Sequence, residues 1–395
     1  MEAHDNPTEL GFSAERLTRI TTVTQRFIDE GKLPGFITLV ARKGKIAYLH
    51  ANGLMDIADN RPMQPDTIFR IFSMTKPIAS VALLMLFERS LCLLSDPVAK
   101  YLPEFADTKV YQDGELVDQI NPMTVQNLLT HTAGLSYGGE HSHVDRLYMK
   151  AGLWDKTQTI EQFVKKLAAL PLKYQPGSKW AYSMATDVVG RLVEVLSGQP
   201  LDQFIAENIC KPLGMVDTAF VLDPAKADRL MTCYEIKPDN PLAVYDKSAD
   251  SRWLPPVNCF MGGSGMVSTM ADYYRFTQML LNKGQLDGVR ILGRKTVERM
   301  RMNHLTPDLM PVAMEFSPPY HGLGFGLGVS AMVDVSQSGI MGSNGDHGWG
   351  GYAQTTFWID PEEEMIVINM TQCIPSGFYP IRQELRTAVY QALVD

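Results

Sequence analysis

The chain has 395 residues, of which 45% are hydrophobic and 20% are charged, so it is long enough to bury a large core in two lobes. Its formal net charge is −8 and it has no basic run, which argues against a nucleic-acid-binding protein. The start, MEAHDNPTEL, does not resemble a signal peptide, and no apolar run reaches transmembrane length. We therefore expect a cytoplasmic protein that is not embedded in a membrane.

The cysteines and histidines predict neither disulfides nor a metal centre. The cysteines are scattered without a C-x-x-C pair, as is typical of reduced, buried thiols: Cys92, Cys210, Cys233, Cys259 and Cys373. His141 and His143 flank a serine in a polar loop, but no third ligand is evident beside them. We expect no metal and no cofactor.

The predicted elements begin with an amphipathic helix over 12–30, which Ser13 caps and Gly31 ends. Two β-rich runs, FITLVARKG and KIAYLHANG, follow with a turn at Lys43-Gly44 between them, which predicts a hairpin. The run IASVALLMLFE, after Pro77, is apolar on nearly every face and therefore predicts a buried central helix. Pro77 places the start of that helix, because proline is tolerated in its first turn.

The middle of the chain is predicted to be mainly helical, and the C-terminal part to return to strands. Helices are expected at 125–130, 159–170, 185–196, 201–209, 270–282, 294–302 and about 379–393. Strands are expected at 324–333, 353–359 and 364–369. The segment 134–144 is expected to be an exposed loop, and 220–260 has little periodicity.

This order of elements predicts an α+β fold with two lobes. Residues 1–72 and about 300–395 are expected to form an antiparallel sheet flanked by helices. Residues from about 73 to 299 are expected to form a mainly helical lobe. The two lobes together make one catalytic unit over 1–395, with the active site between them.

Ser73 and Lys76 stand at the tip of the predicted central helix, on one face and one turn apart. A serine hydroxyl becomes a nucleophile when a neighbouring group takes its proton, and burial favours the neutral amine of a lysine that could do so. The N–H of Ser73, at a helix start, could face an oxyanion. The alternative is a helix-capping serine beside a solvated lysine.

Tyr182 stands directly before the helix predicted at 185–196. A tyrosine beside a lysine ammonium can serve as a base or proton shuttle. Taken alone, Tyr182 fits a packing aromatic of the core better than a catalytic residue.

Two glycine-rich segments are candidates for the floor and wall of the site. The segment Asp346-His347-Gly348-Trp349-Gly350-Gly351-Tyr352 precedes a strong strand and could present a second oxyanion N–H, or it could be a hairpin turn with a structural tryptophan. The segment GGSGMVST at 262–269 is expected to be a turn beneath the site.

Two other motifs match familiar patterns without their structural context. Ser136 lies in a G-x-S-x-G sequence, but a short helix precedes it and a loop follows, whereas that motif needs a strand before the serine and a helix after it. Gly324-Phe325-Gly326 lacks the spacing and the helix of a dinucleotide-binding loop.

The order of Ser73-x-x-Lys76, Tyr182 and the segment 347–351 resembles the serine β-lactamase and penicillin-binding-protein superfamily. Within it, the chain is similar to the family VIII carboxylesterases, which share the class C β-lactamase fold. The resemblance covers nearly the whole chain and includes the phrases LLTHTAGLSYG, PGSKWAYS, KPLGMVDTAF and GGSGMVSTMADYYRF. It implies that Ser73 is the acylated nucleophile, Lys76 its proton-accepting partner and Tyr182 the residue that activates serine or water.

The resemblance also implies an oxyanion hole made by the N–H of Ser73 and an N–H near Trp349 and Gly350, with His347 and Gly351 in the same segment. Tyr137 and Met184 are expected to line the substrate pocket. The chain departs from the pattern at two motifs: Met184 replaces the asparagine of Tyr-x-Asn, and His-Gly-Trp-Gly-Gly replaces Lys-Thr-Gly. Either His347 or Trp349 takes the place of the lysine.

These losses predict a less cationic site, because that lysine and asparagine bind the carboxylate and amide of a penicillin or peptide. We therefore expect a serine carboxylesterase that acts on small, uncharged, short-chain esters. The alternatives on the same fold are a β-lactamase, a D-amino-acid peptidase, an amide hydrolase or an acyltransferase. An alternative of another class is a non-catalytic protein that binds peptidoglycan or a partner.

Overall fold

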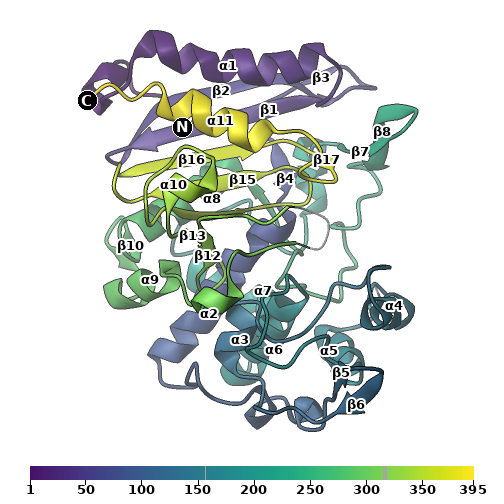
Figure 1. Cartoon of the computed structure of the whole chain (residues 1–395). Coiled ribbons are helices and arrows are strands. Elements are labelled where there is room, and N and C mark those ends of the chain that lie inside the picture. Colours follow the sequence, from purple (N-terminus) through teal and green to yellow (C-terminus); the bar gives the residue numbers. More distant parts are fainter. Residues whose placement is uncertain (156, 315–317) are drawn as a thin grey trace.

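The computed structural model describes residues 1–155, 157–314 and 318–395, and it places a sheet lobe on a mainly helical lobe (Figure 1). Helices α1 (Ala14–Asp29) and α11 (Ile381–Tyr390) lie side by side along one face of the sheet. Ser13 caps α1 by accepting a hydrogen bond from the N–H of Arg16, as the sequence predicts. The first and last helices of the described chain therefore cover the same sheet.

The main sheet has eight strands in the order β12-β13-β14-β15-β16-β1-β2-β3, and every neighbouring pair is antiparallel. Its strands are β1 (Gly35–Arg42), β2 (Lys45–Asp56), β3 (Arg61–Pro62), β12 (Leu323–Phe325), β13 (Ser330–Met332), β14 (His347–Gly350), β15 (Thr356–Asp360) and β16 (Met365–Met370). Leu39 of β1 is paired with Ile368 of β16. The predicted antiparallel sheet that joins the two ends of the chain is confirmed.

The remaining elements are shorter or lie in the helical lobe. The helices are α2 (Thr75–Glu88), α3 (Val125–Leu129), α4 (His143–Lys150), α5 (Ile160–Ala168), α6 (Ala185–Ser197), α7 (Leu201–Ile205), α8 (Met270–Leu281), α9 (Arg294–Arg301) and α10 (Val335–Ser338). The minor strands are β4 (Ile68–Arg70), β5 (Val110–Gln112), β6 (Glu115–Val117), β7 (Cys233–Lys237), β8 (Asn240–Asp246), β9 (Val267–Thr269), β10 (Gln285–Leu286), β11 (Val289–Arg290) and β17 (Cys373–Ile374).

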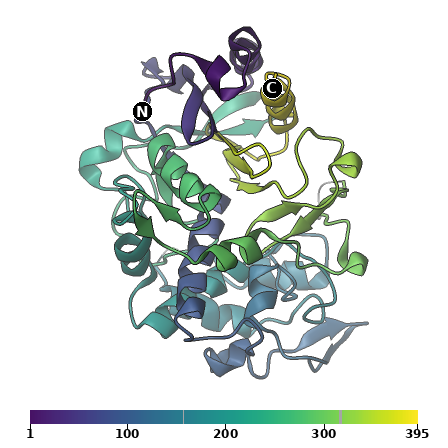
Figure 2. The same cartoon turned by 90° about the vertical axis from the view of Figure 1, so that its left-hand side faces the viewer.

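Helix α2 is the buried central helix that its apolar sequence predicts. All its residues from Thr75 to Leu86 are buried, and it packs against α6 and α7. The turned view shows α2 passing through the middle of the molecule (Figure 2). The helix begins at Thr75, two residues before Pro77, and a 3₁₀ turn over Phe72–Met74 leads into it. Because this helix is surrounded by core, its N-terminal tip is held firmly in place.

The sheet face opposite α1 and α11 is covered in part by α8, which packs on β15 and β16. The rings of Tyr273 on α8 and Phe357 on β15 lie 5.2 Å apart. Helix α8 falls within the range 73–299 that we assign to the helical lobe, yet it belongs with the sheet. The lobe boundaries themselves stay a prediction.

Several predicted elements need correction. The strand predicted at 324–333 is two short strands, because Gly328 adopts a positive φ of 88° and turns the chain between β12 and β13. The loop predicted at 134–144 ends earlier, since Ser142 caps α4 by accepting from the N–H of Asp145. The strand predicted at 353–359 begins at Thr356, and the helix predicted at 201–209 changes after Ile205 to a wider π-type turn.

The poorly periodic region 220–260 holds the antiparallel pair β7–β8, which sequence reasoning missed. Strand β7 also pairs in parallel with β17, which comes from near the end of the chain. This separate three-stranded sheet therefore depends on a long-range pairing that no local sequence pattern indicates. No helix in the described parts of the chain has the length and apolar character needed to span a bilayer.

Candidate active site

Ser73 lies in the 3₁₀ turn just before α2, in a backbone conformation fixed by its aromatic neighbour. Phe72 adopts a positive φ of 43°, which costs energy for a residue with a side chain. Its ring is held edge-on by Trp253 at 5.5 Å and by Tyr352 at 6.1 Å. This packing stabilises the sharp turn and leaves Ser73 only partly buried.

Lys76 is fully buried beside Ser73, and oxygen atoms surround its amine. Its Nζ lies 3.2 Å from Ser73 Oγ, and it donates hydrogen bonds to the Tyr137 hydroxyl at 2.8 Å and to the carbonyl of Gly263 at 2.8 Å. Three oxygens therefore surround the nitrogen: an ammonium can donate to all three, and a neutral amine can donate to Tyr137 and Gly263 while its lone pair accepts from the Ser73 hydroxyl. The arrangement fixes the amine next to the serine hydroxyl.

Tyr182 lies in the turn before α6, and its ring face covers the amine of Lys76. The ring centroid is 4.6 Å from Lys76 Nζ, a cation–π distance. The Tyr182 hydroxyl accepts a hydrogen bond from Trp349 Nε1 at 3.2 Å. The structure therefore brings Ser73, Lys76 and Tyr182 together, but the tyrosine hydroxyl that hydrogen-bonds to the lysine belongs to Tyr137.

Strand β14 presents Trp349, rather than His347, to this cluster. The Trp349 ring lies 5.3 Å from that of Tyr182. His347 is buried and lies near the carbonyl of Gly345 at 3.3 Å, and burial lowers the pKa of its imidazole to about 4. No contact between His347 and Ser73, Lys76 or Tyr182 is found in the described part of the chain. Trp349, and not His347, is therefore the residue of this segment that contacts Tyr182.

The glycines after Trp349 let the strand end approach the serine turn. A Cβ on Gly351 would lie 2.6 Å from the carbonyl oxygen of Ile71, so a side chain at this position would push the two segments apart. The N–H of Gly351 donates to Thr355 at 2.8 Å across the turn, and N–H groups alternate along a strand. The N–H of Gly350 therefore points to the other side of the strand.

Tyr352 is the last residue of the segment 346–352, and no role of its own was predicted for it. Its N–H takes part in no hydrogen bond among the residues that the structure describes, and neither does that of Ser73. Phe72 lies next to both residues: its ring packs against that of Tyr352, and it directly precedes Ser73 in the chain. Arg382 of α11 supports this edge by donating to the carbonyls of Gly351 at 3.0 Å and Thr355 at 3.1 Å.

The two predicted pocket residues have different surroundings. Tyr137 is partly exposed and contacts Lys76 directly through its hydroxyl. Met184 is fully buried in the main core, where its N–H donates to the carbonyl of Ser136 at 3.4 Å. Met184 therefore brings no polar group to the site.

Ser136, the serine of the G-x-S-x-G sequence, is part of a buried polar cluster. Its hydroxyl donates to Asp145, which also accepts from Ser142 Oγ at 2.7 Å and Lys173 Nζ at 2.6 Å. The cluster joins the loop to α4, and the carboxylate that accepts from Ser136 is held in place by Ser142 and by the charge of Lys173. Its contacts are those of a structural serine.

Sequence reasoning assigned no individual role to three residues that lie at the site. His131 is fully buried with a positive φ of 54°, and its ring lies 4.8 Å from that of Tyr182. Its Nδ1 accepts from the N–H of Ser183 at 3.3 Å, and burial holds the pKa of His131 well below its usual value. The other two are Gly263 and Asp187. The available sequence signal for Asp187 was an acidic residue directly before the apolar pair Val188-Val189 in the first turn of α6.

Metal ligation is not evident in the described residues. They hold no group of three histidine, cysteine or acidic side chains placed to bind an ion. His143, one of the two loop histidines, stacks on Tyr111 with 4.7 Å between the ring centroids.

Comparison with known proteins places this arrangement in a family. The family model described as Beta-lactamase matches residues 20–391. Esterase EstB of Burkholderia gladioli is 32% identical over 406 residues, covering 98% of this chain and 98% of that protein. The structure of EstCE1, a hydrolase with promiscuous acyltransferase activity, superposes with a TM-score of 0.81 at 29% identity, over 95% of this chain and 99% of that one. Unliganded simvastatin synthase (LovD) of Aspergillus terreus gives a TM-score of 0.82 at 26% identity, over 96% and 98%.

Proposed function

The chain belongs to the beta-lactamase family, and on that premise we propose that it is a serine carboxylesterase that hydrolyses small, uncharged, short-chain esters through an acyl-enzyme on Ser73. The observation that carries the proposal is the distance of 3.2 Å between Ser73 Oγ and Nζ of the fully buried Lys76. The esterase activity named for the relative EstB supports the same reaction type.

Acylation begins with attack of Ser73 Oγ on the ester carbonyl. As the Oγ–C bond forms, the hydroxyl proton passes to Lys76 Nζ, the basic group in hydrogen-bonding distance. The negative charge on the carbonyl oxygen is stabilised by the N–H of Ser73 and a second N–H from the edge at Gly350 and Tyr352.

Collapse of the tetrahedral intermediate expels the alcohol, which needs a proton. Tyr182 supplies this proton to the alcohol. The phenolate that remains is stabilised by the Lys76 charge beneath its ring and by the hydrogen bond from Trp349 Nε1. Water then attacks the acyl-enzyme, gives up its proton to the same pair and releases the acid. A proton from the water replaces the one that Tyr182 gave to the alcohol, and the proton that Lys76 took returns to Ser73 Oγ as the acid leaves.

The preference for uncharged esters follows from the residues that surround Tyr182. Trp349 donates one neutral N–H where a lysine would present a charge, and Met184 adds no polar group. A carboxylate or peptide amide therefore lacks the paired donors that penicillins and D-amino-acid peptides require. Turnover of β-lactams is expected to be weak or absent.

Transfer of the acyl group to an alcohol is the second candidate function. Two solved structures that this one resembles are named for acyl transfer, as simvastatin synthase and as a hydrolase with promiscuous acyltransferase activity. The acyl-enzyme would be the same, and only the second nucleophile would differ. Adding a small alcohol to the assay and measuring the new ester by mass spectrometry separates the two outcomes.

The test of the proposal is covalent trapping with an aryl fluorophosphonate, followed by peptide mass spectrometry and by assays on nitrophenyl butyrate and nitrocefin. We expect the adduct on Ser73, ester hydrolysis that Ser73→Ala abolishes, and little nitrocefin turnover. An adduct on Ser136 would overturn the assignment of the nucleophile. Absence of any adduct or hydrolysis would favour a non-catalytic binding protein.

A further inference from the structure

Asp187 is a buried carboxylate next to the site that the mechanism above does not use. It lies in the first turn of α6, five residues after Tyr182, and its side chain is 1% exposed. Burying a charge is costly unless nearby groups compensate it. The contacts of this carboxylate therefore need an explanation.

The compensating contact is with Gly263, in the turn that comes before β9. Asp187 Oδ1 accepts a hydrogen bond from the N–H of Gly263 at 2.7 Å, whereas Oδ2 has no partner among the described residues. A Cβ on residue 263 would lie 2.7 Å from Oδ2 and 2.9 Å from Oδ1. Only glycine allows the backbone to approach the carboxylate this closely.

Gly263 in turn holds Lys76, because its carbonyl accepts from Lys76 Nζ at 2.8 Å. The remaining contacts of the amine, with Ser73 and Tyr137, are to neutral hydroxyl oxygens. No ion pair of Lys76 occurs within the described residues. The negative charge that acts on Lys76 through space is that of Asp187.

We infer that Asp187 is a positioning residue for the proposed reaction: it fixes the Gly263 backbone that holds Lys76 and stabilises the ammonium that forms when Lys76 takes the Ser73 proton. The chain Ser73–Lys76–Gly263–Asp187 thus resembles a nucleophile, its base and an orienting acid, with a glycine between the last two. This inference rests on the proposed function of Ser73 and Lys76.

The effect of Asp187 on the reaction should depend on pH, because only its ionised carboxylate can supply the negative charge. Burial raises the pKa of Asp187 to about 6, against the opposing effects of the Lys76 charge and the Gly263 N–H. Besides Lys76, the titratable groups that face it are Tyr137 and Cys259. Burial raises the pKa of Tyr137 well above its usual value and that of Cys259 to about 12, so neither titrates near pH 6. Acylation of Ser73 is therefore expected to weaken as the pH falls through 6.

The test compares the wild type with Asp187→Asn, which keeps an acceptor for Gly263 and loses the charge. Two rates are measured from about pH 5 to pH 9: kcat/KM on nitrophenyl butyrate and the rate of fluorophosphonate labelling of Ser73. We expect an acid limb near pH 6 in the wild type that is absent in the variant. We also expect kcat to fall by about tenfold to a hundredfold with little change in KM.

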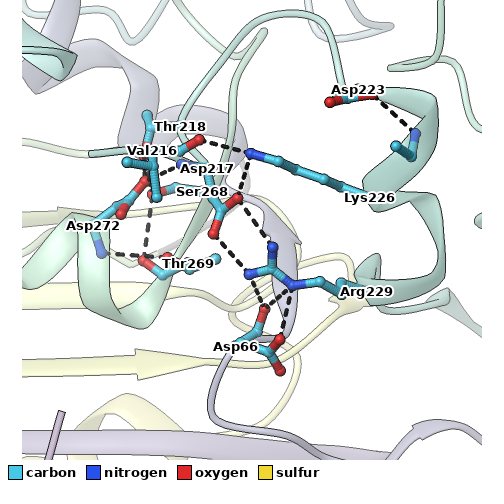
Figure 3. Close-up of polar contacts among 11 residues, drawn as sticks. Asp66, Val216, Asp217, Thr218, Asp223, Lys226, Arg229, Ser268, Thr269 and Asp272 are labelled. Carbon is cyan, nitrogen blue, oxygen red and sulfur yellow. Dashed lines mark hydrogen bonds and ion pairs between the residues drawn. The ribbon is translucent and has the colours of Figure 1, made fainter. Parts of the chain in front are cut away.

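Asp272 supplies a matched control for the effect of losing a buried helical carboxylate. It is also buried in the first turn of its helix, α8, and its Oδ2 accepts from the N–H of Asp217 at 2.7 Å and from Thr218 Oγ1 at 2.9 Å (Figure 3). Asp272→Asn should lower the thermal midpoint as much as Asp187→Asn does. It should leave the acid limb unchanged.

The outcomes separate the inference from the proposed function. If Ser73 is labelled and ester is hydrolysed but the acid limb is missing from the wild type or retained in Asp187→Asn, this inference is wrong and the proposed function stands. The wild-type profile gives this answer even if the variant does not fold. If Ser73 is neither labelled nor needed for hydrolysis, the proposed function fails and the inference fails with it.

Discussion

Tyr137→Phe removes the hydroxyl that accepts a hydrogen bond from Lys76 and leaves the ring in place. The hydroxyl lies 2.8 Å from Lys76 Nζ, and the ring is packed against that of Tyr182 with 5.2 Å between centroids. We expect the variant to fold normally and to lose activity, because one of the three oxygens around the amine is missing.

The size of the loss follows from the type of bond. A hydrogen bond to a charged group contributes about 1.5–3 kcal/mol, and each ~1.4 kcal/mol is a factor of ten in rate. If the bond is fully expressed when Lys76 holds the Ser73 proton, kcat/KM should fall by about 10-fold to 150-fold. Most of the loss should appear in kcat, since the bond strengthens as Lys76 gains the proton in the transition state and the hydroxyl contacts the base rather than the substrate.

The assay is steady-state hydrolysis of nitrophenyl butyrate, with Tyr48→Phe as the control. Tyr48 lies on β2 and its hydroxyl forms a hydrogen bond of 2.7 Å with Thr21, so the control also loses one tyrosine hydroxyl bond. The control should keep kcat/KM within about twofold of the wild type. Circular dichroism and thermal unfolding show whether each variant is folded.

The reasoning would be refuted if Tyr137→Phe kept the wild-type kcat/KM while Tyr182→Phe lost it. That result would mean that the hydroxyl of Tyr182, which hydrogen-bonds to Trp349 in this structure, turns to Lys76 when substrate is bound. A rise in KM alone would instead place Tyr137 in substrate binding.

Three other changes test the surroundings of the site. Ser136→Ala removes a donor to the buried Asp145, so urea titration should show a loss of about 1–3 kcal/mol of unfolding free energy, with activity of the folded protein nearly unchanged. Gly351→Ala places a Cβ 2.6 Å from the Ile71 carbonyl and should lower kcat by about tenfold or more, whereas an unchanged kcat would show that the oxyanion edge tolerates the shift. Burial lowers the pKa of His347 from 6.5 to about 4, so its neutral form stabilises the fold fully above pH 6.5 and this contribution is lost as the pH falls towards 4. His347→Gln should flatten the decline of the thermal midpoint across that range, and parallel curves would contradict this account.

The sequence predicted the parts of the site that depend on local pattern. Ser73 and Lys76 are three residues apart at the start of an apolar run. A helix that is apolar on every face is stable only when it is buried, so the run predicts a central helix. Tyr182 stands just before a helix, and the ends of secondary elements are where side chains reach a shared site. The antiparallel sheet was predictable for a similar reason, since β-branched runs mark both ends of the chain.

The remaining parts depend on tertiary packing, which no local pattern specifies. His347 and Trp349 are two residues apart and so share one face of β14; which of them contacts Tyr182 is decided by where along the strand Tyr182 meets it, and no local pattern specifies that position. The partners of Lys76 come from Tyr137 and Gly263, which lie 61 and 187 residues away along the chain. Their convergence follows from the fold as a whole.

The groups proposed to react share one structural feature, which explains why their geometry is fixed. Ser73 and Lys76 stand at the start of α2, while Tyr182 precedes α6 and Asp187 lies in its first turn, and the two helices pack directly against each other. The buried bodies of α2 and α6 therefore set the distance between the nucleophile, its base and the tyrosine. Their N-terminal ends meet Gly263 and Trp349 from other segments, so the site is assembled where core packing ends and polar groups can face a substrate. It follows that large-to-small substitutions along the α2–α6 contact should lower activity before they unfold the protein, because a small shift of one helix separates groups held only 3.2 Å apart.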